Sequence, residues 1–450
     1  MAPPDAARHP GLEPYLAAFA GLRSEARTED AWHTRLRQEA IDRFAARGLP
    51  TTRDEAWRYT NLNPLLTTAF DPRPASRPQN LTPALFEQLT FQPWDCAHLV
   101  FLDGRFAPDL SRTGRLPEGV RLLNLAAALS ADRDKVEPAF GRVATARGRA
   151  LTDLNTALMT DGLFLHVARG IVVEEPIHAL FVSTTGGTPA MSHPRNLVVL
   201  EEGAQASIVE SYAGLDGGAY LTNAVTEVVL ADHARLEHVR LERESAGAYH
   251  MSHVEAALAR SSVFVTHSVS LGGALVRHDV DTVLDGEGAE CSLNGLYVLD
   301  GRQHVDNHTL IDHARPHGTS RELYKGVLDG QSRGIFDGTI IVRPDAQKTD
   351  ARQTNRNLLL SEEALADTKP TLQIYADDVR CNHAATIGQI DEEALFYLRS
   401  RAISEEVARG MLIRAFVSDI LGRINIGPLR AGLECLLFTR LPRHHPREAA

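Results

Sequence analysis

The chain is poor in cysteine and has no long apolar run. Only four of its 450 residues are cysteine, and they lie far apart with no Cys-x-x-Cys pair. This spacing excludes a disulfide framework and a self-contained zinc module. No stretch of about 18 or more apolar residues occurs, which excludes a membrane-spanning helix. The N-terminus lacks a basic segment followed by an apolar run, so we expect no signal peptide and a cytoplasmic protein.

Positive charge is also scarce. The sequence has 47 basic and 58 acidic residues, which gives a formal net charge of −11. A basic surface is what attracts a protein to nucleic acid or to anionic lipid without regard to sequence, so we expect neither partner. Phosphate-binding loops of the forms G-x-x-x-x-G-K-[ST] and G-x-G-x-x-G are absent. Any nucleotide chemistry would therefore belong to another protein.

The chain divides into three regions by its local pattern. Residues 1–160 are predicted to be mostly helical, with apolar residues at three- and four-residue spacing near the start. From 161 to 385, short β-branched runs alternate with turns rich in Gly, Asp and Asn. From 386 to 450, helical patterns that begin at Asp391 and Ser404 carry a broad apolar stripe, which needs something to pack against.

The central region has a quasi-period of nearly thirty residues. Small-residue turns at Ala204, Ala234, Ser262 and Ala289 are separated by 30, 28 and 27 residues, and each precedes an alternating strand. Repeats of this size without intervening helices indicate a solenoid of stacked strands. An antiparallel sandwich would give similar strands, but Asn-Gly, a strong hairpin signal, occurs only at 294–295. The pattern predicts a mainly β protein, a parallel β-helix flanked by helical regions.

A five-residue motif matches the pattern of a hydrolase nucleophile elbow. Gly330-Gln331-Ser332-Arg333-Gly334 fits G-x-S-x-G. That motif functions on a sharp turn from a strand into a helix, whereas the residues that follow here, "IFDGTIIV", predict a strand. We expect no hydrolase site at this position.

A cluster of four histidines occurs between residues 302 and 318. The segment "RQHVDNHTLIDHARPHG" contains His304, His308, His313 and His317, and imidazole is the commonest metal ligand. The four would share one face only in a helix, but the Val, Thr, Leu and Ile content predicts strands and turns. Structural or interface roles are favoured over direct metal contact, and both remain open.

Cys381 and His383 form a sharper candidate. The segment "LQIYADDVRCNHAAT" alternates as a last strand before the C-terminal helices. Residues i and i+2 of a strand face the same side, about 6.5–7 Å apart, so a thiolate and an imidazole here can reach one metal ion. A structural metal takes four ligands, so the pair supplies half of a site. The alternative is a buried free cysteine beside an incidental histidine.

The residues around this pair resemble the SufB/SufD family of the SUF iron–sulfur cluster assembly machinery. Residues 336–403 are similar to it throughout, and 54–62, 154–178 and 303–334 also match, so the resemblance covers nearly the whole chain. SufB typically reads Cys-Glu-His-Glu-Ala-Thr and SufD Cys-Ser-His-Gly-Ala-Thr. This sequence reads Cys-Asn-His-Ala-Ala-Thr from Cys381 onward, without either glutamate, and is more similar to SufD.

The resemblance implies a right-handed parallel β-helix and a scaffold subunit that catalyses nothing alone. Cys381 and His383 would lie at the interface with SufB, a homologous β-helix subunit, and would hold iron or a nascent iron–sulfur cluster transiently. The helical domain 386–450 would dock the ATPase SufC, and this chain would bind no nucleotide. SufB and SufC are therefore the expected partners, and whether the isolated chain forms a homodimer stays open.

Two other functions remain open. Many parallel β-helices are polysaccharide lyases or hydrolases, which line one face with paired carboxylates or basic residues and are usually exported. A pure interaction scaffold would differ from the favoured reading only in whether Cys381 and His383 bind iron. The sequence assigns no role beyond packing to Cys96, Cys291 or Cys435.

Overall fold

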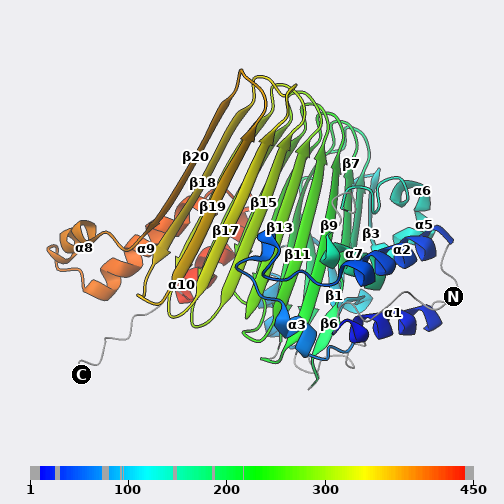
Figure 1. Ribbon diagram of the computed structural model, residues 1–450, viewed down its shortest axis with the longest axis horizontal. Helices are drawn as coiled ribbons and strands as arrows, with labels where there is room; N and C mark the ends of the chain where they lie inside the picture. The colour runs from blue at the N-terminus through cyan, green and yellow to red at the C-terminus, as the bar shows by residue number, and fades with distance from the viewer. Residues whose placement is uncertain are drawn as a thin grey trace.

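The protein is a two-sheet solenoid with helices at both ends (Figure 1). The computed structural model describes residues 11–25, 31–72, 81–91, 94, 96–144, 149–184, 188–215 and 217–440. Ten strands form the first sheet, in the order β2-β1-β5-β8-β10-β12-β14-β16-β18-β20, and the second sheet runs β19-β17-β15-β13-β11-β9-β7-β4-β3, with β6 paired to β9.

The strands of the two sheets have the following bounds. The first sheet contains β1 (Ala97–Leu102), β2 (Arg105–Phe106), β5 (Ile177–Ser183), β8 (Gln205–Gly214), β10 (Arg235–Arg243), β12 (Val263–Ser270), β14 (Glu290–Leu299), β16 (Thr319–Leu328), β18 (Asp350–Leu359) and β20 (Arg380–Gly388). The second contains β3 (Val120–Asn124), β4 (Leu163–Val167), β6 (Ala190–Ser192), β7 (Arg195–Leu200), β9 (Tyr220–Leu230), β11 (Tyr249–Leu258), β13 (Leu275–Leu284), β15 (His304–His313), β17 (Arg333–Val342) and β19 (Leu365–Ile374).

From β7 onward the chain passes alternately from one sheet to the other. Each strand pairs in parallel with the strand two elements later, one coil further along the axis, as in β12 with β14 and β13 with β15. The predicted parallel β-helix is therefore confirmed. The right-handedness of the β-helix stays a prediction.

The predicted small-residue turns lie where the coils stack most closely. Ala204, Ala234, Ser262 and Ala289 are all fully buried, immediately before β8, β10, β12 and β14. Backbone hydrogen bonds join one turn to the next: the amides of Arg235 and Val263 donate to the carbonyls of Ala204 and Ala234, both at 2.9 Å. A larger side chain at these turns would enter the neighbouring coil, which explains the small residues.

Helices cover the outer faces of both sheets. The N-terminal region contains α1 (Glu13–Glu25), α2 (Ala31–Arg47), η2 (Glu55–Trp57), α3 (Asn63–Thr67), α4 (Pro83–Leu89), η3 (Pro108–Leu110), α5 (Leu125–Ala131), α6 (Arg133–Val136) and α7 (Ala150–Leu158). Apolar residues of α2 and α7 pack with Met251 of β11 and Leu275 of β13. The N-terminal region also extends both sheets, because β1 pairs with β5 and β3 pairs with β4.

The C-terminal helices are α8 (Glu392–Arg399), α9 (Glu405–Leu421) and α10 (Gly427–Arg440). Val417 and Ile420 of α9 pack in one apolar cluster with Val269 and Leu296 of the first sheet. Asp391 accepts hydrogen bonds from the amides of residues 393 and 394, so it caps α8 as its position before that helix predicted. Among the described residues, no helix is long and apolar enough to span a membrane.

The interior of the solenoid is apolar in part and polar in part. Along β10, Leu236 faces the inner apolar cluster, so His238, Arg240 and Glu242 also point inward, whereas Val239 and Leu241 pack under the C-terminal helices. The three inward polar side chains are fully or almost fully buried. The interior of a solenoid is usually filled with stacked aliphatic side chains. This interior therefore contains an unusual number of buried charged and polar side chains.

Glu322 is a buried inner carboxyl whose environment favours the protonated form. It lies on β16 and accepts a hydrogen bond from Gln353 Nε2 at 2.7 Å. Burial raises the pKa of Glu322 from its ordinary value of 4.5 to about 7, against hydrogen bonds from Thr309 and Gln353 that lower it. The folded chain therefore holds a proton there that the unfolded chain releases above pH 4.5.

We predict that Glu322→Gln stabilises the protein at alkaline pH. The wild-type chain loses stability as pH rises from about 4.5 to about 7, because over this range the unfolded chain releases a proton that the folded chain still holds. The variant does not undergo this loss, so its advantage in free energy of unfolding grows over that pH range and levels off at about 3.5 kcal/mol at most, roughly 1.4 kcal/mol per unit of pKa shift. Urea unfolding of both proteins at pH 5 and pH 8 measures it. An advantage of equal size at both pH values would contradict the raised pKa.

Candidate functional site

Cys381 and His383 lie on β20, the last strand of the first sheet. Parallel pairing with β18 places Cys381 beside Ala351 and His383 beside Gln353. Cys381 packs against the inner apolar cluster, so its side chain faces the solenoid interior, and His383 two residues later shares that face. In earlier coils this inner row is covered by the next coil. At β20 the stacking ends, which leaves Cys381 half-buried and His383 exposed.

The thiol and the imidazole have different surroundings. Partial burial raises the pKa of the Cys381 thiol, and Asp350 raises it further, against a backbone hydrogen bond at Ala351 that lowers it. The thiol is therefore protonated at neutral pH, and a metal ion would have to displace that proton. Behind His383, in the same inner row, Gln353 donates to Glu322. His383 is thus the last residue of a short polar row, whereas Cys381 ends a row that continues through Ala351.

The last coil, which carries the pair, exposes several apolar side chains and has two strand edges. Among the exposed large apolar side chains are Leu365, Ile374 and Tyr375 in or beside β19, and Ile387 in β20. β19 and β20 end their sheets, so each presents backbone groups that pair with no further strand of the described chain (Figure 1). Unprotected edges beside apolar side chains are typical of a surface that receives another β-structure.

A second apolar surface lies on the C-terminal helices. Phe396 and Tyr397 of α8 and Val407 and Met411 of α9 are 74, 55, 55 and 44% exposed, and we call these four the helical apolar row. The apolar stripe predicted for α9 is thus split, since its other side packs on the first sheet. Lys325 of β16 fixes α9, because its Nζ donates to the Phe416 carbonyl and pairs with Asp419, both at 2.9 Å.

The four clustered histidines do not converge. His304 Nε2 lies 3.0 Å from Thr60 Oγ1, and His308 Nε2 lies 3.0 Å from Asp306 Oδ1, both on the outer face of the second sheet. His313 points inward, 2.9 Å from Ser320 Oγ. His317 is in a surface turn with φ of 61°. These separate hydrogen-bonded places support the structural role that the sequence favoured.

The other sequence candidates occupy ordinary positions. Cys96 and Cys291 are buried, and burial raises the pKa of Cys291 well above its usual value, whereas Cys435 is exposed on α10. Ser332 is fully buried in the turn between β16 and β17, so the G-x-S-x-G match leads into a strand and presents no nucleophile.

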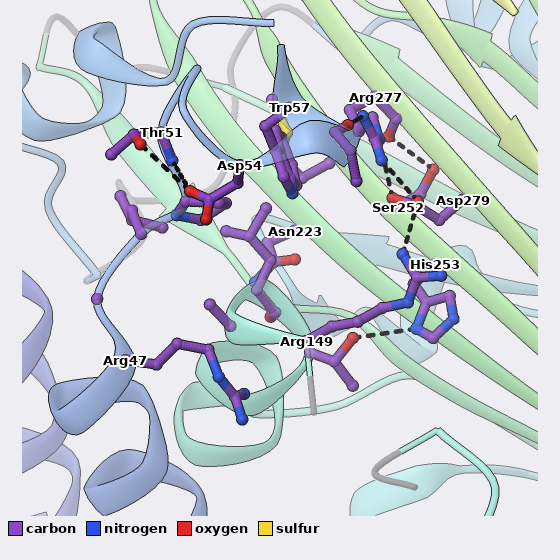
Figure 2. Close-up of a pocket in the computed structure, with 18 of the residues that line it drawn as sticks. Arg47, Thr51, Asp54, Trp57, Arg149, Asn223, Ser252, His253, Arg277 and Asp279 are labelled. Atoms are coloured by element: carbon purple, nitrogen blue, oxygen red, sulfur yellow. Dashed lines mark hydrogen bonds and ion pairs between the residues drawn. The ribbon is translucent and has the colours of Figure 1, made fainter. Parts of the chain in front are cut away.

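Sequence reasoning missed a cavity between the N-terminal region and the second sheet. It has a volume of about 830 Å³, and its lining includes Trp57, Arg149, His253, Arg277 and Asp279 (Figure 2). Beside it lies a buried group made of His253, Glu255 and Asp281. The available signal was the alternation His-x-Glu in "YHMSHVEAAL" and Asp-x-Asp in "RHDVDTVL", which places these side chains on one face of adjacent strands.

Models of known protein families match both the N-terminal region and the solenoid core of the chain. Residues 181–416 match the SufBD core domain of SUF system FeS cluster assembly, and residues 15–179 match the SufBD protein N-terminal region. The core match contains most of the solenoid, β20 with Cys381 and His383, and most of α9.

Individual relatives align over almost their full length. An iron–sulfur cluster assembly SufBD family protein of Synechocystis sp. is 34% identical over 90% of both chains. The iron–sulfur cluster assembly protein SufD of Escherichia coli is 30% identical over 94% of this chain and 99% of its own, and SufD of Bacillus subtilis is 29% identical over 92% and 94%. With its solenoid, its flanking helices and the pair on its last coil, the chain belongs to the SufBD family of the SUF system for iron–sulfur cluster assembly.

Proposed function

We propose that this chain is the SufD-type scaffold subunit of a SufBCD complex and contributes Cys381 and His383 to a nascent cluster site shared with a SufB-type subunit. One observation carries the proposal: the two side chains share the inner face of the last coil, where stacking ends and the row is open. The Cys-Asn-His-Ala-Ala-Thr reading supports the SufD type over the SufB type, since it lacks both glutamates.

The donor types suit iron and sulfide. A thiolate and a neutral imidazole are ligands that iron accepts in clusters. Because the pKa of the Cys381 thiol is raised, iron binding would release its proton, whereas His383 would bind through a neutral ring nitrogen. Two ligands leave half of the coordination to a second protein. In this proposal iron and the cluster are cargo that the complex assembles, and the chain itself catalyses nothing and binds no nucleotide.

The two apolar surfaces suit two different partners. The edges of β19 and β20 fit a second solenoid that continues the coil stacking, which is the structure expected of a homologous SufB-type subunit. The helical apolar row fits the ATPase SufC, because it is exposed on α8 and α9 and Lys325 ties α9 to the first sheet. ATP-driven movement of SufC would thus be transmitted to the solenoid that carries Cys381 and His383. No observation favours a polysaccharide-acting enzyme.

We predict that Cys381→Ala and His383→Ala each lower cluster assembly on the order of tenfold or more, since each removes a direct ligand. The measurement is activity of an iron–sulfur reporter enzyme in cells that depend on this system, with complex integrity checked by co-purification. Cys435→Ser is the matched control and keeps full assembly. Wild-type assembly by both single variants would refute the shared site.

We predict that Cys381 changes its accessibility on complex formation. In the isolated chain, iodoacetamide modifies Cys381 slowly, because the protonated thiol is unreactive, and the rate rises with pH. In the complex Cys381 becomes protected, while exposed Cys435 stays reactive at an unchanged rate. Peptide mass spectrometry at pH 8 follows both. Equal modification of Cys381 in the isolated chain and in the complex would place the interface elsewhere.

We predict that Met411→Asp and Val407→Asp weaken binding of the SufC-type ATPase at least about tenfold, or ~1.4 kcal/mol, because each puts a charge into an apolar contact. Cys435→Asp introduces the same charge on the exposed face of α10 and leaves binding unchanged. Calorimetric titration of the purified ATPase measures the affinity. Retained affinity in both α9 variants would exclude the helical apolar row as the docking surface.

A further inference from the structure

A second cluster of metal-binding residue types lies far along the solenoid from β20. His253 and Glu255 are on β11 and Asp281 is on β13, where register pairs Glu255 directly with Asp281. All three side chains are on the outer face of the second sheet and are less than 9% exposed. His253 Nε2 lies 3.6 Å from Glu255 Oε2 and 3.5 Å from Asp281 Oδ2, and one donor atom from each residue lies within 4.8 Å of the others.

These separations suit a shared metal ion better than direct hydrogen bonds. A charge-assisted N–H···O⁻ bond measures about 2.7–2.9 Å, so 3.5 and 3.6 Å are too long. Ligand atoms that each lie about 2.0–2.2 Å from a tetrahedral ion are roughly 3.4 Å apart. His253 Nε2 is buried and makes no hydrogen bond.

The ring of His253 is held with Nε2 facing the carboxylates. Its other nitrogen, Nδ1, lies 3.0 Å from Thr152 Oγ1 of α7. In the tautomer that donates the Nδ1 proton to this oxygen, Nε2 has a free lone pair. Such a partner on the second nitrogen is the usual way in which proteins orient a metal-binding imidazole. In that tautomer the Nε2 lone pair and the two carboxylates offer three donors to one cation.

Two arginines pair with the carboxylates around the group. Arg149 contacts Asp279 and Asp281 at 2.7 Å, and Arg277 contacts Asp279 at 3.0 Å and Asp306 at 2.7 Å. Glu255 faces the same network, since its charge also acts on Arg149. Arg47, which also lines the cavity, is engaged by Asp153.

We propose that His253, Glu255 and Asp281 bind one divalent first-row transition-metal ion. One imidazole and two carboxylates suit Zn²⁺, Fe²⁺ or Mn²⁺. His253 lines the cavity, which gives the ion an entry path and space for water as a further ligand. Thr152 and Arg149, which contact His253 and Asp281, come from the segment around α7, so the ion would lie where the N-terminal region packs on the solenoid. This inference does not depend on the proposed function of Cys381 and His383.

The test is a Zn²⁺ titration of the full-length chain against a chromophoric chelator. It uses the Cys381→Ala/His383→Ala double variant, so that the last coil contributes no binding. We expect one Zn²⁺ per chain and a rise in melting temperature with Zn²⁺. In this background Glu255→Gln, which keeps the side-chain shape, and His253→Ala weaken binding at least about a hundredfold, and Thr152→Val weakens it about 10–100-fold.

The matched control is His308→Ala. His308 contacts Asp306 of the same charged network but lies outside the three donors, so its removal leaves Zn²⁺ affinity unchanged. Circular dichroism verifies that each variant is folded. The proposal is overturned if the double variant shows no saturable Zn²⁺ binding, or if Glu255→Gln and His253→Ala bind as it does.

Discussion

The parallel register between coils is the constraint on which the rest of this structure depends. Each strand obtains its hydrogen bonds from the coils before and after it, so side chains in one row lie over one another along the axis. This register requires small buried residues in turns, such as Ala234 and Ser262. It also determines which side chains form the inner row that ends in Cys381. It also means that the last coil has neighbours on one side only. The candidate cluster site lies on this last coil, where the stacking of coils ends.

The same register concentrates charge in the protein. Residues in one row come from successive coils, so polar residues at equivalent positions become close neighbours. On the inner face, Glu322 and Gln353 meet in this way, and on the outer face Arg277 meets Asp306. These contacts are long-range in sequence, since 29 to 31 residues separate the partners. Burial makes each such contact costly to break and sensitive to protonation.

The fold could be predicted from the sequence because the signals were local and repeated. Turn residues, strand alternation and helix starts such as Asp391 each report on their own segment, and a repeat of nearly thirty residues multiplies the signal. The pair Cys381 and His383 was found for the same reason, since two residues apart on a strand share a face. The four histidines from His304 to His317 show where such local reasoning ends. Their number within one segment does not reveal that they lie on both faces of a strand and in a turn.

The cavity group could not be predicted, because its partners come from three separate elements. Nothing near Thr152 in the sequence indicates that α7 will lie against His253, 101 residues later. For a similar reason, the sequence did not reveal that one side of the apolar stripe on α9 is exposed and the other packs on the first sheet. The exposure of Met411 depends on the orientation of α9 on β16. The ion pair between Lys325 and Asp419, which are far apart in the sequence, helps to fix that orientation.

The open end has a thermodynamic consequence. In a solenoid, stability is close to a sum of each repeat and its nearest-neighbour interfaces, and a terminal repeat has one interface where an inner repeat has two. The coil of β19 and β20 is therefore the first expected to open locally, and it carries Cys381 and His383. A partner that docks on these edges would act as a missing repeat. Complex formation and ordering of the two ligands would then be one cooperative event, so the isolated chain would hold them less rigidly than the assembled one.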